Sequence, residues 1–116
     1  MTSTELSLLV LKTQQLDVVK SFYEHLGIEF EQERHGEGPV HYAARLGQLV
    51  FELYPANNDL SDSTTRVGFV VEELQDKIDN LVQNQLASSK TPKQTPWGLR
   101  VVVRDPDGRA VELYQK

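Results

Sequence analysis

The sequence contains no cysteine, which excludes disulfides, thiolate metal ligands and cysteine nucleophiles and favours a reducing compartment. The apolar stretch at residues 6–11 is too short for a signal core or a membrane span, and no basic side chain precedes it. We therefore expect a cytoplasmic protein that does not enter a membrane. Basic residues are dispersed and the net charge is −5, which argues against nucleic-acid binding and favours small or cationic ligands.

Several catalytic motifs are missing as well. The sequence has no phosphate-binding loop, no dinucleotide-binding fingerprint, no His-Glu-x-x-His motif and no nucleophile elbow. Serine, histidine and carboxylate side chains are what remains for chemistry.

One strand pattern occurs twice. Residues 51–54 read Phe-Glu-Leu-Tyr and residues 111–114 read Val-Glu-Leu-Tyr, so the two glutamates lie 60 residues apart (112 − 52). A half of roughly 55 residues would bury too little surface to be stable alone, so both halves are predicted to share one domain over residues 1–116. We define module one as residues 1–55, a linker as residues 56–63 and module two as residues 64–116.

Each module is predicted to have the order βαβββ. The first strand is apolar without alternation, which is typical of a central strand buried on both faces. Helical spacing of apolar residues and a glycine stop mark the first helix, and Gly47-Gln48 marks a tight hairpin. The predicted strands are residues 6–11, 28–32, 41–46, 49–54, 66–71, 97–104 and 109–114, and the predicted helices are residues 16–26 and 74–82.

Strand alternation predicts two faces. Side chains alternate sides along a strand, so one face of the sheet is apolar and should pack under the helices. The other face collects the polar residues of both repeats. The apolar set is Phe51, Leu53, Val111 and Leu113, and the polar set is His41, Glu52, Tyr54, Arg66 and Glu112.

Several short motifs follow one another in a recognisable order: Phe22-Tyr23, Leu26-Gly27, Phe51-Glu52-Leu53-Tyr54, Pro96-Trp97-Gly98-Leu99-Arg100 and Asp105-Pro106-Asp107-Gly108 with Val111-Glu112-Leu113. In this order the chain resembles the glyoxalase/bleomycin resistance/dioxygenase family, also called the vicinal oxygen chelate superfamily, over essentially its whole length. The resemblance implies an α+β fold in which two tandem βαβββ modules form a concave mixed sheet around a cavity, with the helices on the outer face. It also implies a homodimer, which would cover exposed edge strands.

Metal-dependent members of that family bind a divalent ion through four positions, often two His and two Glu. The resemblance places these positions at Leu8, Glu52, Arg66 and Glu112. Leucine cannot ligate a metal, and a protonated guanidinium puts a cation where the ion would lie. We therefore predict no cofactor at these positions, with Arg66 as a substitute for the metal. A divalent metal ion held by His41, Glu52 and Glu112 is the alternative.

Two interpretations of the polar face stay open. Arg66 with the two glutamates forms either a buried charge network between the modules or the lining of a binding pocket. His41, beside the carboxylates, is a candidate general base with Glu112, or a metal ligand. The candidate substrate-binding residues are His35, Glu52, Tyr54, Arg66, Trp97, Arg100 and Glu112, whereas Asp105 and Asp107 are predicted as turn residues.

The sequence thus predicts a small-molecule-binding protein that lacks the usual two-His two-Glu metal site. One alternative is a metal-dependent lyase, isomerase or dioxygenase that resembles glyoxalase I and uses His41, Glu52 and Glu112, or a metal-free enzyme with His41 as base. Another is a resistance protein that sequesters an antibiotic. Whether the protein is an enzyme is left open by the sequence.

Overall fold

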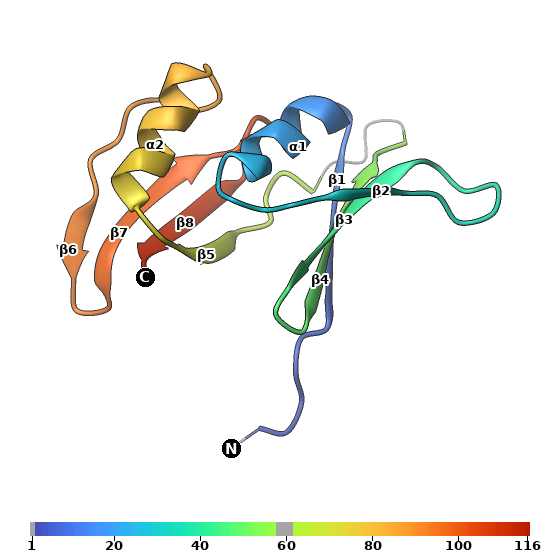
Figure 1. The fold of residues 1–116 in the computed structure, drawn as a ribbon, viewed down its shortest axis with the longest axis horizontal. Helices are drawn as coiled ribbons and strands as arrows, with labels where there is room; N and C mark the ends of the chain where they lie inside the picture. The colour runs from blue at the N-terminus through green and yellow to red at the C-terminus, as the bar shows by residue number, and fades with distance from the viewer. Residues whose placement is uncertain (1, 58–61) are drawn as a thin grey trace.

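The computed structural model describes residues 2–57 and 62–116 (Figure 1). The predicted linker includes residues 58–61, which lie outside the described residues. The βαβββ order is confirmed in both modules. Module one contains β1 (Leu8–Thr13), α1 (Leu16–Glu24), β2 (Glu31–Glu33), β3 (His41–Leu46) and β4 (Leu49–Pro55), and module two contains β5 (Val67–Val71), α2 (Leu74–Gln83), β6 (Lys93–Thr95), β7 (Gly98–Arg104) and β8 (Ala110–Gln115).

The strands form two four-stranded mixed sheets, one in each module. Their orders are β1-β4-β3-β2 and β5-β8-β7-β6. In each sheet the first strand runs parallel to the last, and the other pairs are antiparallel. The α+β class and the two-module architecture are therefore as predicted. Both helices lie on the upper side of the sheets in Figure 1.

The first strand is not central, contrary to the prediction. β1 is an edge strand of its sheet, and its side chains alternate between exposed and buried. Leu8 is 50% exposed while Leu11 is fully buried. An apolar run does not reveal how many strands pair with it. Within the described residues, β1 pairs with β4 alone.

Two other strands, β2 and β6, also differ from the prediction. The second strand covers only Glu31–Glu33, because the backbone before it closes the end of α1: the amide of Ile28 donates to the carbonyl oxygen of Tyr23 at 3.3 Å. Gly27, with φ +99°, provides the left-handed residue that ends the helix. The short strand β6 before Trp97 had no counterpart among the predicted elements.

A single apolar cluster spans both modules. The predicted inward positions of β4 and β8 are fully buried, as alternation required. Ring contacts join the modules, because Phe69 of β5 lies 5.9 Å from Phe51 of β4 and 5.9 Å from Tyr23 of α1, measured between ring centroids. The two predicted faces of the sheets are thus correct. Among the described residues, no helix combines the length and apolarity needed to cross a bilayer.

A buried arginine also holds the modules together. Arg109 is fully buried, and its guanidinium donates to Asp105 at 2.9 Å, to Asp107 at 3.0 Å and to the carbonyl oxygen of Lys12 at 2.6 Å. It also pairs with Asp62, the residue after the undescribed part of the linker. Asp105 and Asp107 do form the predicted turn, but they also belong to this network.

The network reaches α1 through Tyr23, whose hydroxyl donates to Asp105 at 2.7 Å. Burial and the neighbouring carboxylate raise the pKa of Tyr23 above its ordinary value. Burial alone would lower the pKa of Arg109, but its hydrogen bonds to Asp62 and Asp105 outweigh that effect and raise it. Arg109 therefore stays positively charged. Its charge is balanced by Asp62 from one segment and by Asp105 and Asp107 from another.

Candidate functional site

Polar side chains gather around His41 on the predicted polar face of the module-one sheet, which we call the open face. His41 is only 1% exposed, and its Nε2 lies 3.3 Å from Glu33 Oε1 and 3.8 Å from Glu52 Oε2. The Tyr54 ring stacks on the imidazole at 4.0 Å between centroids, with its hydroxyl 3.2 Å from Nε2. His35 approaches from the loop after β2, with its Nε2 3.5 Å from Glu33. We call these five residues the module-one cluster.

Strand register explains this cluster. In the antiparallel β2–β3 pair, Glu33 lies directly opposite His41. In the β3–β4 pair, Ala43 lies opposite Glu52, so His41 and Tyr54 face the same side of the sheet. His41 and Glu52 therefore meet as predicted. The sequence interpretation missed Glu33, because it ended the second strand at residue 32.

A second polar cluster lies on module two. The Glu112 carboxylate accepts hydrogen bonds from Arg100 Nη2 at 2.8 Å and Nε at 3.1 Å, and it also binds the Arg66 guanidinium. Tyr114 donates to the same carboxylate at 3.3 Å. These hydrogen bonds, from Arg66 first and then Arg100, lower the pKa of Glu112 to about 2. We call these four residues the module-two cluster.

The two clusters lie in different sheets. Within the described part of the chain, no hydrogen bond or ion pair joins them. Arg66 binds Glu112 but not Glu52, so one chain does not assemble the predicted triad of Arg66, Glu52 and Glu112. For the same reason, the alternative metal set of His41, Glu52 and Glu112 is not assembled. A single chain therefore presents two separate polar clusters, which we call half-sites.

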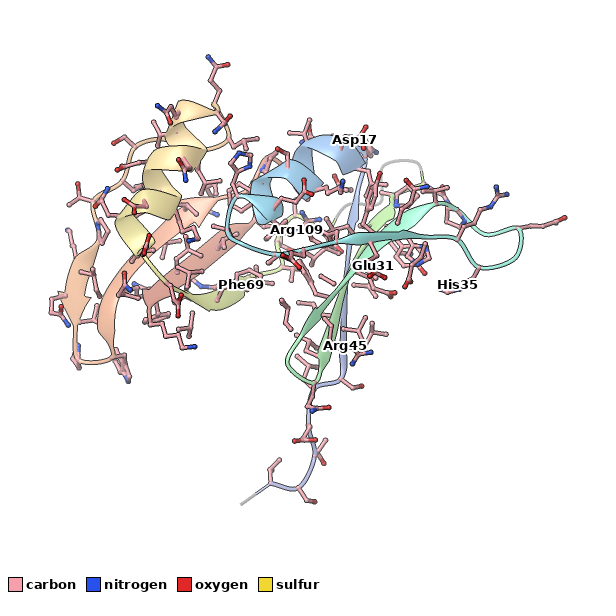
Figure 2. All side chains as sticks on the ribbon, viewed as in Figure 1. Asp17, Glu31, His35, Arg45, Phe69 and Arg109 are labelled. Atoms are coloured by element: carbon pink, nitrogen blue, oxygen red, sulfur yellow. The ribbon has the colours of Figure 1, made fainter. Side chains whose placement is uncertain are left out.

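Trp97 and His25 lie outside both clusters, and His35 lies at the exposed end of the module-one cluster. Trp97 is 80% exposed in the turn between β6 and β7, where it lines neither cluster. His35 has a side chain that is 72% exposed, and Figure 2 shows it on the loop beyond β2, far from Arg109 near the middle of the molecule. His25 lies at the end of α1, with its Nδ1 2.7 Å from the carbonyl oxygen of Ser21, away from both clusters.

Comparison with known proteins identifies the family. The model of the Glyoxalase/Bleomycin resistance protein/Dioxygenase superfamily matches residues 6–113. The chain belongs to this superfamily. No curated protein matches the sequence.

Several solved structures share the fold. TnmS3, an antibiotic binding protein from Streptomyces sp. CB03234, is 20% identical with a TM-score of 0.75, covering 99% of this chain and 98% of its own. A glyoxylase/bleomycin resistance protein/dioxygenase domain from Frankia sp. EAN1pec is 23% identical with a TM-score of 0.72, covering 98% and 93%. The oxidase ChaP-H2 is 12% identical with a TM-score of 0.73, covering 99% and 95%. At these identities the likeness concerns the fold, which hosts both binding proteins and enzymes.

The residues at the four metal positions of the superfamily do not fit a metal ion. Leu8 offers no ligand atom, and Arg66 places a guanidinium against the Glu112 carboxylate. Arg100 occupies the other oxygen of Glu112. In the part of the chain that the structure describes, Glu52 is the one residue of the four whose carboxylate is not paired with an arginine. A zinc site needs about three protein ligands, so these four positions supply too few.

Two concave surfaces lie near the half-sites. A groove of about 690 Å³ lies beside the module-one cluster, and Glu33 belongs to both. Glu31 and Arg45 also line this groove. A mainly apolar cleft of about 510 Å³ lies between β1, β4 and β5. Arg66 is the one charged residue in the lining of that cleft. Apolar walls with few polar groups are typical of small-molecule sites.

The lowered pKa of Glu112 sets a pH dependence. Its ordinary value is 4.5 and its folded value is about 2, so its ion pairs stabilise the fold above pH 4.5 and lose this contribution as the pH falls towards about 2. Replacing Arg100 by Met should move the midpoint of the Glu112 titration back towards 4.5, measured by NMR of the side-chain carboxyl carbon. The matched Arg45→Met variant on sheet one should leave it unchanged. A Glu112 midpoint near 4.5 in the parent would contradict the ion pairs.

Proposed function

We propose that this protein binds a small organic molecule and does not use the usual metal centre of its superfamily. The observation that carries this proposal is the state of Glu112, whose two carboxylate oxygens are engaged by Arg66 and Arg100. A carboxylate held in this way is a poor metal ligand, because a cation would have to displace two guanidiniums. The lack of cysteine supports a cytoplasmic location for this binding protein.

We further propose that the ligand lies between two copies of the chain in a homodimer. Each chain has two half-sites that do not meet, and each sheet ends in a strand that pairs on one side only, β1 or β5. These edges carry exposed apolar side chains: Leu8 of β1 is 50% exposed and Val70 of β5 is 65% exposed, and Leu6, just before β1, is 69% exposed. Exposed apolar edge strands invite strand pairing. Pairing β1 of one copy with β5 of its partner would bring unlike half-sites together.

The charges of the half-sites indicate the class of ligand. The module-one cluster carries two carboxylates and a stacked His–Tyr pair, which suit a cationic or aromatic group. The module-two cluster carries two guanidiniums around one carboxylate, which suit an anionic or carbonyl group. A polar aromatic compound of the antibiotic type fits this combination. The antibiotic-binding function of TnmS3 makes such compounds the first class to test.

A thermal-shift screen tests this proposal. We expect at least one compound from a panel of antibiotics, thiol conjugates and dicarbonyls to raise the melting temperature of the protein, because a ligand of the folded state stabilises it. Tyr54→Ala and Arg100→Met should each reduce the shift, whereas Arg104→Met, at an exposed position outside both clusters, should not. Recovery of the compound unchanged supports a binding protein. Recovery of a chemically altered compound would contradict the binding-protein proposal and would support an enzyme that uses His41 as base.

A further inference from the structure

We propose that Glu33, His35 and His41 bind one divalent transition-metal ion of the zinc class. None of these three residues is at one of the four metal positions of the superfamily. They belong to the module-one cluster, so the ion would share that cluster with the proposed organic ligand, but zinc binding itself needs neither that ligand nor a second copy of the chain. The three side chains come from β2, the following loop and β3. One carboxylate and two imidazoles are a ligand set that zinc accepts in proteins.

The spacing of the ligand atoms fits tetrahedral coordination. Zinc bonds of about 2.0–2.1 Å place neighbouring ligand atoms about 3.3–3.4 Å apart around a tetrahedron. Glu33 Oε1 lies 3.3 Å from His41 Nε2 and 3.5 Å from His35 Nε2. All three ligand atoms lie within 4.8 Å of one another. The side chain of His35 is 72% exposed and its ring centroid lies 5.1 Å from that of His41, so the two imidazoles lie side by side at the surface.

The orientation of His41 supports this assignment independently. Its Nδ1 lies 3.2 Å from the carbonyl oxygen of Pro39, and because a carbonyl can only accept, Nδ1 carries the proton. Nε2 is then directed into the cluster. An imidazole that donates one ring N–H to a backbone carbonyl and presents the other nitrogen is the usual arrangement of a metal-bound histidine. The stacked Tyr54 ring fixes the plane of this imidazole.

The local charge also favours a cation. Nε2 of His41 faces the carboxylates of Glu33 and Glu52, which repel each other unless a positive charge lies between them. Glu52 Oε2 lies 3.8 Å from Nε2 and adds negative charge beside the three proposed ligands. Arg34, the nearest arginine in sequence, instead donates to the carbonyl oxygen of Gly38 at 2.9 Å. That bond helps to close the loop that carries His35.

Calorimetry with Zn²⁺ tests the site on protein freed of metal with a chelator. We expect one zinc ion to bind per chain. Glu33→Gln and His35→Ala should each weaken zinc binding by at least about tenfold, since each removes one of three ligands. The side chain of His35 is 72% exposed and that of Glu33 is 35% exposed, so neither substitution removes a core side chain and both variants should fold. The matched control is His25→Ala, which removes the one histidine outside the cluster and should leave the affinity unchanged.

Several different results would contradict the proposed zinc site. Absence of zinc binding in the parent, or binding that Glu33→Gln and His35→Ala leave unchanged, would show that the cluster is a proton-sharing ion pair. Zinc binding that is lost in Glu112→Gln and retained in Glu33→Gln would place the ion at the superfamily positions instead. Co²⁺ should in turn give the intense visible absorption of tetrahedral coordination, and an octahedral spectrum would contradict the proposed geometry. None of these results depends on the compound screen.

Discussion

Replacing Arg109 by methionine should lower the free energy of unfolding by about 3–5 kcal/mol, the usual cost of removing one partner from a buried charge network. Methionine fills a similar volume, but it leaves the buried Asp105 carboxylate without its cation and the carbonyl oxygen of Lys12 without its donor. The contact between α1 and module two should loosen as well, because Tyr23 binds the same carboxylate. Urea denaturation at neutral pH measures the loss.

The control for this prediction is the last residue of β7, just before the same turn. Arg104 is exposed and donates to the carbonyl oxygen of Gly108 at 3.1 Å, so Arg104→Met should change the stability by no more than about 0.5 kcal/mol. A similar small effect of Arg109→Met would show that solvent reaches the aspartates. The network would then not hold the modules together.

Replacing Val70 by lysine should weaken the dimer by more than about 100-fold, because burying an unpaired ammonium costs about 3 kcal/mol or more. Val70 lies on β5, the edge strand of sheet two, and is 65% exposed in the single chain. In a two-fold symmetric dimer the substitution enters the interface twice. Sedimentation equilibrium over a range of concentrations measures the dissociation constant.

Val18→Lys is the matched control for the dimer. Val18 is a 43% exposed valine on α1, away from both edge strands, so its replacement should leave the dimer intact. If the parent is a monomer at all concentrations, the proposed pairing of β1 and β5 is wrong. If Val70→Lys dimerises as tightly as the parent, the chains associate through another surface.

The architecture was predictable from the sequence because its determinants are local and repeated. Alternation placed Phe51 and Leu53 on the buried face and Glu52 on the open one, and the structure agrees. Gly27 marked the end of the first helix because glycine adopts the positive φ of a helix end without a steric penalty, and this preference can be read from the sequence alone. The edge position of β1 was not predictable, because an apolar strand reads the same whether its neighbour belongs to its own chain or to a partner.

The composition of the site was predictable only in part. Strand alternation identified His41, Glu52, Tyr54 and Glu112 as residues of the open face, but it does not say how two sheets are placed relative to each other. Glu33 was missed because its role follows from the β2–β3 register, which a boundary error of one residue conceals. The burial of Arg109 depends on Asp62, 47 residues earlier (109 − 62), and no local pattern encodes that contact.

The central claim is that one ligand site combines half-sites from two copies, and mixing two defective variants tests it most directly. Tyr54→Ala damages module one and Arg100→Met damages module two, so either variant alone should not bind the panel compound that most stabilises the parent. After the two are unfolded together and refolded as an equal mixture, half of the dimers should be mixed, each with one intact site. Equilibrium dialysis should then recover about a quarter of the parent's bound ligand, given two sites per symmetric dimer. No recovery in a mixture shown to contain mixed dimers would mean that each site lies within a single chain.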